Sequence, residues 1–190
     1  MRLAPILLII FCKISIAQTN LDTVYQFELA ATASSLISFF EEERYPGSDN
    51  YQSLGFGFFV RAMWHPARLL SVGLMTGYCQ IAKDEFKDSV GTTASARLSA
   101  IPLQLAVSMQ GENFELGLGM GPYLMITNID YYSSAQASRY ELGITSFAVY
   151  AFSLNDNIKI GPELRVLYLS YRKIVSIFPS LFIRFEILRY

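Results

Sequence analysis

Nine charged residues of this chain lie at alternating positions of extended segments, so within each segment they lie on the same face. They are five glutamates and four basic residues: Glu28, Glu115, Glu141, Glu163, Glu186, Arg61, Lys159, Arg165 and Arg184. Two neighbouring carboxylates can act as a general acid and a general base, whereas a carboxylate beside a guanidinium group forms an ion pair. Because five negative charges nearly cancel four positive ones, we favour buried ion pairs over an ion pathway, which would tolerate an excess of one sign.

The other reactive side chains are few. His65 is the only histidine, and the run from His65 to Arg68 predicts a tight turn, away from any serine nucleophile on a strand. Cys79 has the parity of Ser71 and Gly73, which predicts a buried and inert thiol, and a lone thiol is a poor metal site. We therefore expect a non-enzymatic protein without catalytic or metal-binding residues.

Two short motifs have structural interpretations that we prefer to ligand binding. The glycines at 117, 119 and 121 are followed by Pro122, where the dinucleotide fingerprint requires another glycine. They share the parity of Glu115, which predicts a stripe of small residues facing a crowded interior. The run from Glu41 to Glu43 could bind calcium, but a solvated loop is the more common role of such a run. We expect no cofactor.

The elements that position these residues show a two-residue period. Between residues 51 and 63, Leu54, Phe56 and Phe58 have one parity while Gly55 and Gly57 have the other. This is the period of a β-strand whose two faces meet different surroundings. Eight such segments are predicted, at about residues 24–38, 51–64, 69–81, 97–109, 114–127, 139–154, 158–171 and 176–190.

The connections between the segments predict an up-and-down topology. Short turns are expected at 65–68, 110–113 and 155–157, and longer loops at 39–50, 82–96 and 128–138, with a short fourth loop at 172–175. Short turns on the periplasmic side and longer loops outside are typical of transmembrane β-barrels. An even number of strands places both termini in the periplasm.

The apolar residues that share one parity are too numerous to fit inside a small barrel. An eight-stranded barrel encloses packed side chains or one small ligand. Apolar residues such as Leu105, Leu116 and Leu118 are therefore predicted to face lipid, and the charged set to fill the lumen. The sequence thus predicts an all-β fold, an eight-stranded antiparallel up-and-down transmembrane β-barrel.

The N-terminus predicts export. A positive residue, an apolar run from Leu3 to Phe11 and the sequence Ser15-Ile16-Ala17 are typical of a signal peptide cleaved after residue 17. We expect a signal peptide over residues 1–17 and an outer-membrane β-barrel domain over 18–190. Cleavage would leave 13 basic and 16 acidic residues, a net charge of −3, which disfavours nucleic-acid binding.

The chain resembles the small eight-stranded outer-membrane barrels of the OmpA/OmpX type, especially the outer-membrane β-barrel domain proteins common in Bacteroidetes. The resemblance rests on Ser15-Ile16-Ala17-Gln18, on the segment from Gly117 to Tyr123 and on the C-terminal Tyr190. It implies location in the bacterial outer membrane, contact with outer-membrane lipid and lipopolysaccharide, and assembly by the barrel assembly machinery. In this family, apolar residues near the C-terminus usually alternate in phase with the terminal aromatic residue. Here they are mostly out of phase with Tyr190, and a bulge near Leu188 would restore the phase.

Several functions remain open at this stage. We favour a barrel that acts through its extracellular loops, in adhesion, envelope integrity or contact with an unknown extracellular partner, with a lumen plugged by paired charges. The main alternative is a narrow pore or small-molecule conduit. A soluble ligand-binding barrel and a lipid-modifying enzyme are weaker alternatives, because a closing helix and a correctly placed histidine are missing.

Overall fold

The computed structural model describes residues 25–40, 50–52, 54–67, 69–87, 93–130, 134–155, 157–171 and 173–189. The predicted signal peptide and its cleavage site lie outside the described residues, as does the acidic run from Glu41 to Glu43. No helix among the described residues is long and apolar enough to cross a membrane.

Ten strands occur in the described part of the chain. The eight long strands are β1 (Gln26–Phe40), β3 (Leu54–Ala67), β4 (Leu70–Lys87), β5 (Thr93–Gln110), β6 (Phe114–Asp130), β7 (Ser134–Tyr150), β9 (Ile158–Leu169) and β10 (Ile174–Arg189). Two short strands are β2 (Asn50–Gln52), which pairs with β4, and β8 (Phe152–Asn155), which pairs with β9.

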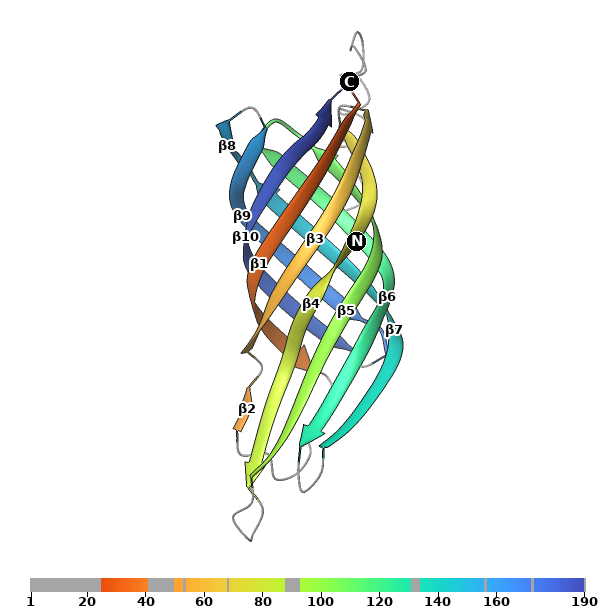
Figure 1. The fold of residues 1–190 in the computed structure, drawn as a ribbon, viewed down its shortest axis with the longest axis vertical. Coiled ribbons are helices and arrows are strands. Elements are labelled where there is room, and N and C mark those ends of the chain that lie inside the picture. The colour runs from red at the N-terminus through yellow and green to blue at the C-terminus, as the bar shows by residue number, and fades with distance from the viewer. Residues whose placement is uncertain are drawn as a thin grey trace, which may run out of the picture.

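The eight long strands form one closed antiparallel ladder. Each pairs with the next in the order β1, β3, β4, β5, β6, β7, β9 and β10, and β10 pairs with β1. The strands wind around a common axis, and the C-terminus lies at the end of the barrel where β1 begins (Figure 1). The predicted fold class, an eight-stranded up-and-down barrel, is confirmed.

The outer wall is apolar and the interior is mixed. Leu105 and Leu118 are 71% and 61% exposed, whereas Arg61 and Arg165 are buried. Exposed large apolar side chains on almost every strand give the lipid-facing band that a membrane barrel requires. The assignment of the two parities to the two faces therefore agrees with the structure.

Two predicted outer loops are in fact mostly strand. β4 continues to Lys87 and β5 begins at Thr93, while β6 continues to Asp130 and β7 begins at Ser134. The predictions of loops at 82–96 and 128–138 were therefore wrong. Figure 1 shows β4 to β7 extending far past the neighbouring strands at the end opposite the one where β1 begins and β10 ends. We call the part of β4 after Cys79, the part of β7 before Gly143 and the segments of β5 and β6 between them the projecting sheet.

Bulges explain two local departures from alternation. The register between β3 and β4 shifts between Trp64 and Ala67, so His65 belongs to the strand and the predicted turn at 65–68 begins too early. The register between β1 and β10 shifts where Phe27 pairs with Leu188 and Glu28 with Glu186. The extra residue is Ile187, so the bulge predicted near Leu188 is present.

The interior has two layers. Toward the projecting sheet it is filled by a large apolar cluster that includes Leu36, Phe59, Ile81, Met125 and Phe178. Toward the termini it contains most of the charged residues. The sequence reasoning assigned polar side chains to the lumen and did not anticipate this apolar layer.

Candidate functional site

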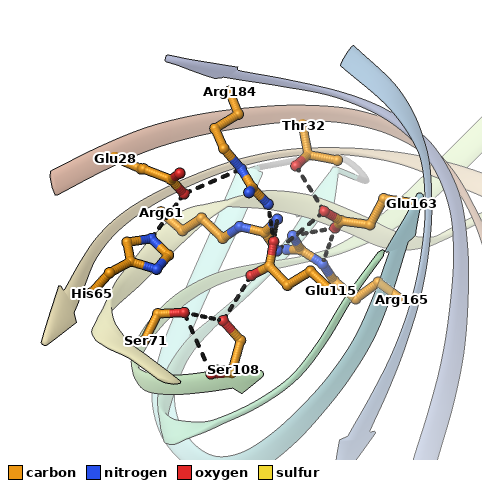
Figure 2. A network of polar contacts seen from close by, with 10 residues as sticks. All are labelled: Glu28, Thr32, Arg61, His65, Ser71, Ser108, Glu115, Glu163, Arg165 and Arg184. Atoms are coloured by element: carbon orange, nitrogen blue, oxygen red, sulfur yellow. Dashed lines mark hydrogen bonds and ion pairs between the residues drawn. The ribbon is translucent and has the colours of Figure 1, made fainter. Parts of the chain in front are cut away.

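A continuous chain of buried charges crosses the interior near the termini (Figure 2). In order of contact, the charge network contains His65, Glu28, Arg184, Glu115, Arg61, Glu163 and Arg165. Each glutamate lies between two cationic or histidine side chains. Three carboxylates face three guanidinium groups, so the network is neutral when His65 is neutral.

The contacts of the network are short. His65 Nε2 lies 2.9 Å from Glu28 Oε2, and Arg184 Nε lies 3.3 Å from the same oxygen. Arg184 also contacts Glu115, which accepts a second contact of 3.2 Å from Arg61 Nη2. The second contact of Arg61, from its Nη1, is 3.3 Å from Glu163 Oε2.

Arg165 forms the last link. Its Nε and Nη2 both donate to Glu163 Oε1, at 2.9 and 2.5 Å. Thr32 donates to the other carboxylate oxygen of Glu163 at 3.4 Å. Glu163 thus contacts two arginines and a hydroxyl group, and both of its hydrogen bonds from Arg165 reach the same carboxylate oxygen.

The strand register brings the network together from five strands. Ala30 on β1 lies opposite Arg61 on β3 and opposite Arg184 on β10. Its small buried side chain leaves space for the two long arginines that flank it. β6 supplies Glu115, while β9 supplies both Glu163 and Arg165.

Aromatic rings cover the guanidinium planes. The Arg61 guanidinium carbon lies 4.3 Å from the centre of the Phe147 ring, and that of Arg165 lies 3.9 Å from the centre of the Phe59 ring. Phe147 needs Gly117 opposite it, because a Cβ atom at 117 would lie only 2.1 Å from the Phe147 ring. The predicted small-residue stripe therefore makes room for the ring that supports Arg61.

Hydroxyl groups extend the network toward β4 and β5. Ser108 donates to Glu115 Oε1 at 2.8 Å, and the Ser71 and Ser108 hydroxyl oxygens are 2.9 Å apart. These two serines bond to each other and to Glu115 rather than to His65. The arrangement therefore gives His65 an orienting carboxylate but no serine nucleophile.

Six of the nine predicted charged residues belong to the network, and three lie elsewhere. Glu141 is buried on β7, with Arg139 Nη2 at 3.9 Å. Lys159 is half-buried opposite Arg184 in the β9–β10 ladder. Glu186, also half-buried, accepts a 3.4 Å hydrogen bond from Gln26 and lies 4.0 Å from Arg189.

His65 is the member of the network that the sequence analysis missed. Its side chain is 3% exposed and points to Glu28. The signal that could have found it is the parity of Arg61, Met63 and His65, which continues past Trp64. A turn was predicted here because of Pro66, although proline is also tolerated at a bulge.

Other predicted features behave as isolated structural residues. Cys79 is buried and its thiol donates to the Ala100 carbonyl at 3.6 Å. Tyr123, the last residue of the segment that begins at Gly117, is buried and its hydroxyl lies 2.6 Å from that of Thr145. The described residues contain no group of three or more His, Cys, Asp or Glu that could hold a metal ion.

The projecting sheet contains a second candidate site, a free strand edge. β9 pairs with β7 only over the stretch that begins at Gly143 and ends at Val149. On its other side β7 pairs with β6 from Ser134 onward. Within the described part of the chain, no strand pairs with the β9-facing edge of residues 134–140, whereas the Leu142 carbonyl already accepts hydrogen bonds from Ser170.

Solved structures of small outer-membrane barrels share this fold. One of them is Ail, the attachment invasion locus protein of Yersinia pestis, which was solved in complex with the heparin analogue sucrose octasulfate. It aligns with a TM-score of 0.55 and 12% identity, over 88% of this chain and 100% of that chain. Neisserial surface protein A aligns with a TM-score of 0.53 and 12% identity over 87% and 100% of the two chains.

A major outer membrane protein from Thermus thermophilus has a TM-score of 0.59 and 16% identity, over 86% of this chain and 99% of that chain. No protein-family model and no curated protein sequence matches the chain. The closed ladder, the apolar outer band and these likenesses define the class of the protein, an outer-membrane β-barrel.

Proposed function

We propose that the protein is a non-enzymatic integral outer-membrane barrel whose projecting sheet contacts an extracellular partner, with its lumen plugged by the charge network and the apolar layer. The observation that carries the proposal is the free β7 edge at the end opposite the termini. In the orientation that we propose, both ends of the barrel chain lie in the periplasm, so the projecting sheet faces the outside of the cell. The likeness of the fold to that of Ail, an attachment protein, supports a role in surface contact.

The composition of the free edge favours strand addition. The segment Ser134-Ala135-Gln136-Ala137-Ser138 contains no charge, glycine or proline. Natural edge strands usually carry such residues, because unpaired backbone groups otherwise recruit another strand. An extended segment of a partner protein can pair with such an edge through main-chain hydrogen bonds.

Two layers support a closed lumen. The charge network spans the interior near the termini, and the apolar cluster around Leu36, Phe59 and Phe178 fills it toward the projecting sheet. An aqueous path would have to cross both layers. We therefore rank the alternative, a narrow pore or small-molecule conduit, below the plugged barrel.

We further propose the partners that the sequence resemblance implies. Outer-membrane lipid and lipopolysaccharide would surround the apolar band, and the barrel assembly machinery would recognise β10. The Ile187 bulge supports this recognition, because it leaves Phe185, Ile187 and Leu188 all exposed on the outside. Membership of the Bacteroidetes group of these barrels is part of the same proposal.

The partner-contact proposal is tested by placing charges on the free edge. Ala135→Lys combined with Ala137→Lys should abolish attachment of barrel-displaying cells to a surface coated with extracellular-matrix protein, since lysine on an edge blocks strand addition. Ala96→Lys is the matched control, because β5 is paired on both sides at that residue. Attachment that survives the double substitution, or that is lost equally in the control, would contradict the role of this edge.

A further inference from the structure

The free edge of β7 has a palindromic sequence. The segment Ser134-Ala135-Gln136-Ala137-Ser138 reads the same in both directions, and all of its residues are exposed. Two antiparallel copies of this segment, centred on Gln136, would place serine opposite serine, alanine opposite alanine and glutamine opposite glutamine. The edge is therefore complementary to itself, as a two-fold interface between identical chains requires.

The backbone of the segment directs hydrogen-bonding groups to the free edge. The Leu142 carbonyl accepts a hydrogen bond from the Ser170 amide, so Leu142 turns its backbone groups toward the β9 side. Successive residues of an antiparallel strand alternate between its two edges, and β6 pairs with every residue of β7 in continuous register. Ser134, Gln136 and Ser138 therefore present their amide and carbonyl groups at the free edge. In the two-fold arrangement, each facing pair of these residues would exchange two main-chain hydrogen bonds.

No charge opposes this pairing. The charged residue of β7 nearest to the segment is Arg139. Across the two-fold axis the two Arg139 residues would lie about 20 Å apart along the strands, which is well beyond the Debye length of about 8 Å at physiological salt. The Arg139 guanidinium carbon also lies 3.8 Å from the centre of the Tyr171 ring, outside the segment that pairs.

The symmetry of the pairing decides which membranes the two copies occupy. The two-fold axis of an antiparallel pair of identical strands is perpendicular to the sheet. Here the sheet is the barrel wall, so the axis points radially and the rotation reverses the direction of the barrel. The two lipid bands then lie at opposite ends of the pair, whatever the tilt of the strands. Two barrels in one bilayer point the same way and cannot form this pair.

We propose that one extracellular partner of the free edge is a second copy of this chain on a facing cell, paired antiparallel through residues 134–138. The inference rests on the proposed contact function of the projecting sheet and names a partner for it. This part of β7 lies at the end of the barrel opposite the one where β1 begins (Figure 1). The two projecting sheets would join into one sheet between the membranes, and each copy would cover the unpaired backbone of the other.

Mixing two populations of barrel-displaying cells tests the proposal. One population carries Ala135→Lys with Ala137→Lys, and the other carries Ala135→Glu with Ala137→Glu. Residue 135 of one copy faces residue 137 of the other, so each variant alone brings like charges together and should form about tenfold fewer cell aggregates than wild type. The mixture should aggregate again, because each lysine then faces a glutamate. Flow cytometry with two fluorescent labels counts the mixed aggregates.

Gln136→Pro separates backbone pairing from side-chain contact. Proline removes an amide that points to the free edge and leaves the ladder with β6 intact, so aggregation should be lost while the heat-dependent gel migration of a folded barrel is kept. Gln136→Ala is the matched control, because it keeps that amide and should aggregate like wild type.

Three results would overturn the inference. They are wild-type cells that do not aggregate, charge variants that aggregate as well as wild type, and a mixture that aggregates no better than either variant alone. The last result would make the partner a different protein. The contact function fails separately, by attachment to matrix protein that survives the double lysine substitution.

Discussion

At the scale of single residues, the charge network is held together by glutamates that each contact two basic side chains. Glu115 holds Arg61 and Arg184, and Glu163 holds Arg61 and Arg165. Removing one arginine therefore leaves a carboxylate with fewer contacts in a space that excludes water. Breaking a buried ion pair in this way is strongly destabilising, whereas replacing both partners with uncharged groups costs much less.

Arg165→Ala tests this dependence. We expect a loss of about 3–5 kcal/mol in the free energy of unfolding, because Glu163 loses both hydrogen bonds that it accepts from Arg165. Adding Glu163→Gln should restore part of the stability, because the buried network then again has equal numbers of carboxylates and guanidinium groups. Thermal unfolding in detergent measures both variants.

Arg189→Ala is the control for Arg165→Ala. Arg189 is mostly exposed, and its contact with Glu186 is 4.0 Å, so its removal should change stability by less than about 1 kcal/mol. A neutral Arg165→Ala, with or without the second substitution, would indicate hydrated walls and would favour the pore.

The sequence could predict which side chains face inward but not which of them meet. Parity placed Arg61, Glu115 and Glu163 in the lumen, because alternation on each strand is a local property. Their contacts join β3, β6 and β9, and depend on how far each strand is shifted along its neighbour around the barrel. His65 was missed for a related reason, since a bulge changes the geometry at a proline that usually marks a turn.

At the scale of strands, the membrane band and the projecting sheet follow different rules. Inside the band, one face meets lipid and the other the packed interior, so residues alternate and the strands are predictable. In the projecting sheet, the segment Ser134–Ser138 is exposed throughout and alternates polar residues with small alanines, so it lacks the bulky apolar face by which a strand is recognised. The ladder nevertheless continues, because backbone hydrogen bonding between adjacent strands does not require an apolar face.

A charge scan along one face should locate the boundary between these two regions. Leu105→Lys should impair assembly by about 2–4 kcal/mol, because Leu105 faces outward in the lipid band. Tyr140→Lys also places a lysine at an exposed, outward-facing position, but on the part of β7 that belongs to the projecting sheet. Folded protein in outer-membrane fractions is the measurement, and we expect the Tyr140 variant to be close to wild type.

Equal damage at Leu105 and Tyr140 would place the projecting sheet in the bilayer. Tolerance at both positions would show that Leu105 does not face lipid, which would remove the basis for the orientation of every strand.

At the scale of the whole molecule, the barrel wall forms a closed ladder, and the edge of β7 is unpaired at one rim within the described residues. The ladder has no free edge in the lipid band, as a membrane barrel requires. The free edge of β7 occurs only where the neighbouring strands have ended. The interior is divided into a charged layer near the termini and an apolar layer near the projecting sheet. In the function that we propose, these two layers seal the body of the barrel and the projecting sheet makes the contact.

Conductance across a planar lipid bilayer tests the sealed interior most directly. We predict that the purified wild-type barrel gives no reproducible current steps, because both interior layers block an aqueous path. Arg165→Ala combined with Glu163→Gln should also stay silent, since the apolar cluster around Phe178 remains in place. Reproducible steps from the wild-type protein that disappear when Arg61 or Arg165 is substituted would show that the lumen conducts, and would contradict the account of a plugged barrel.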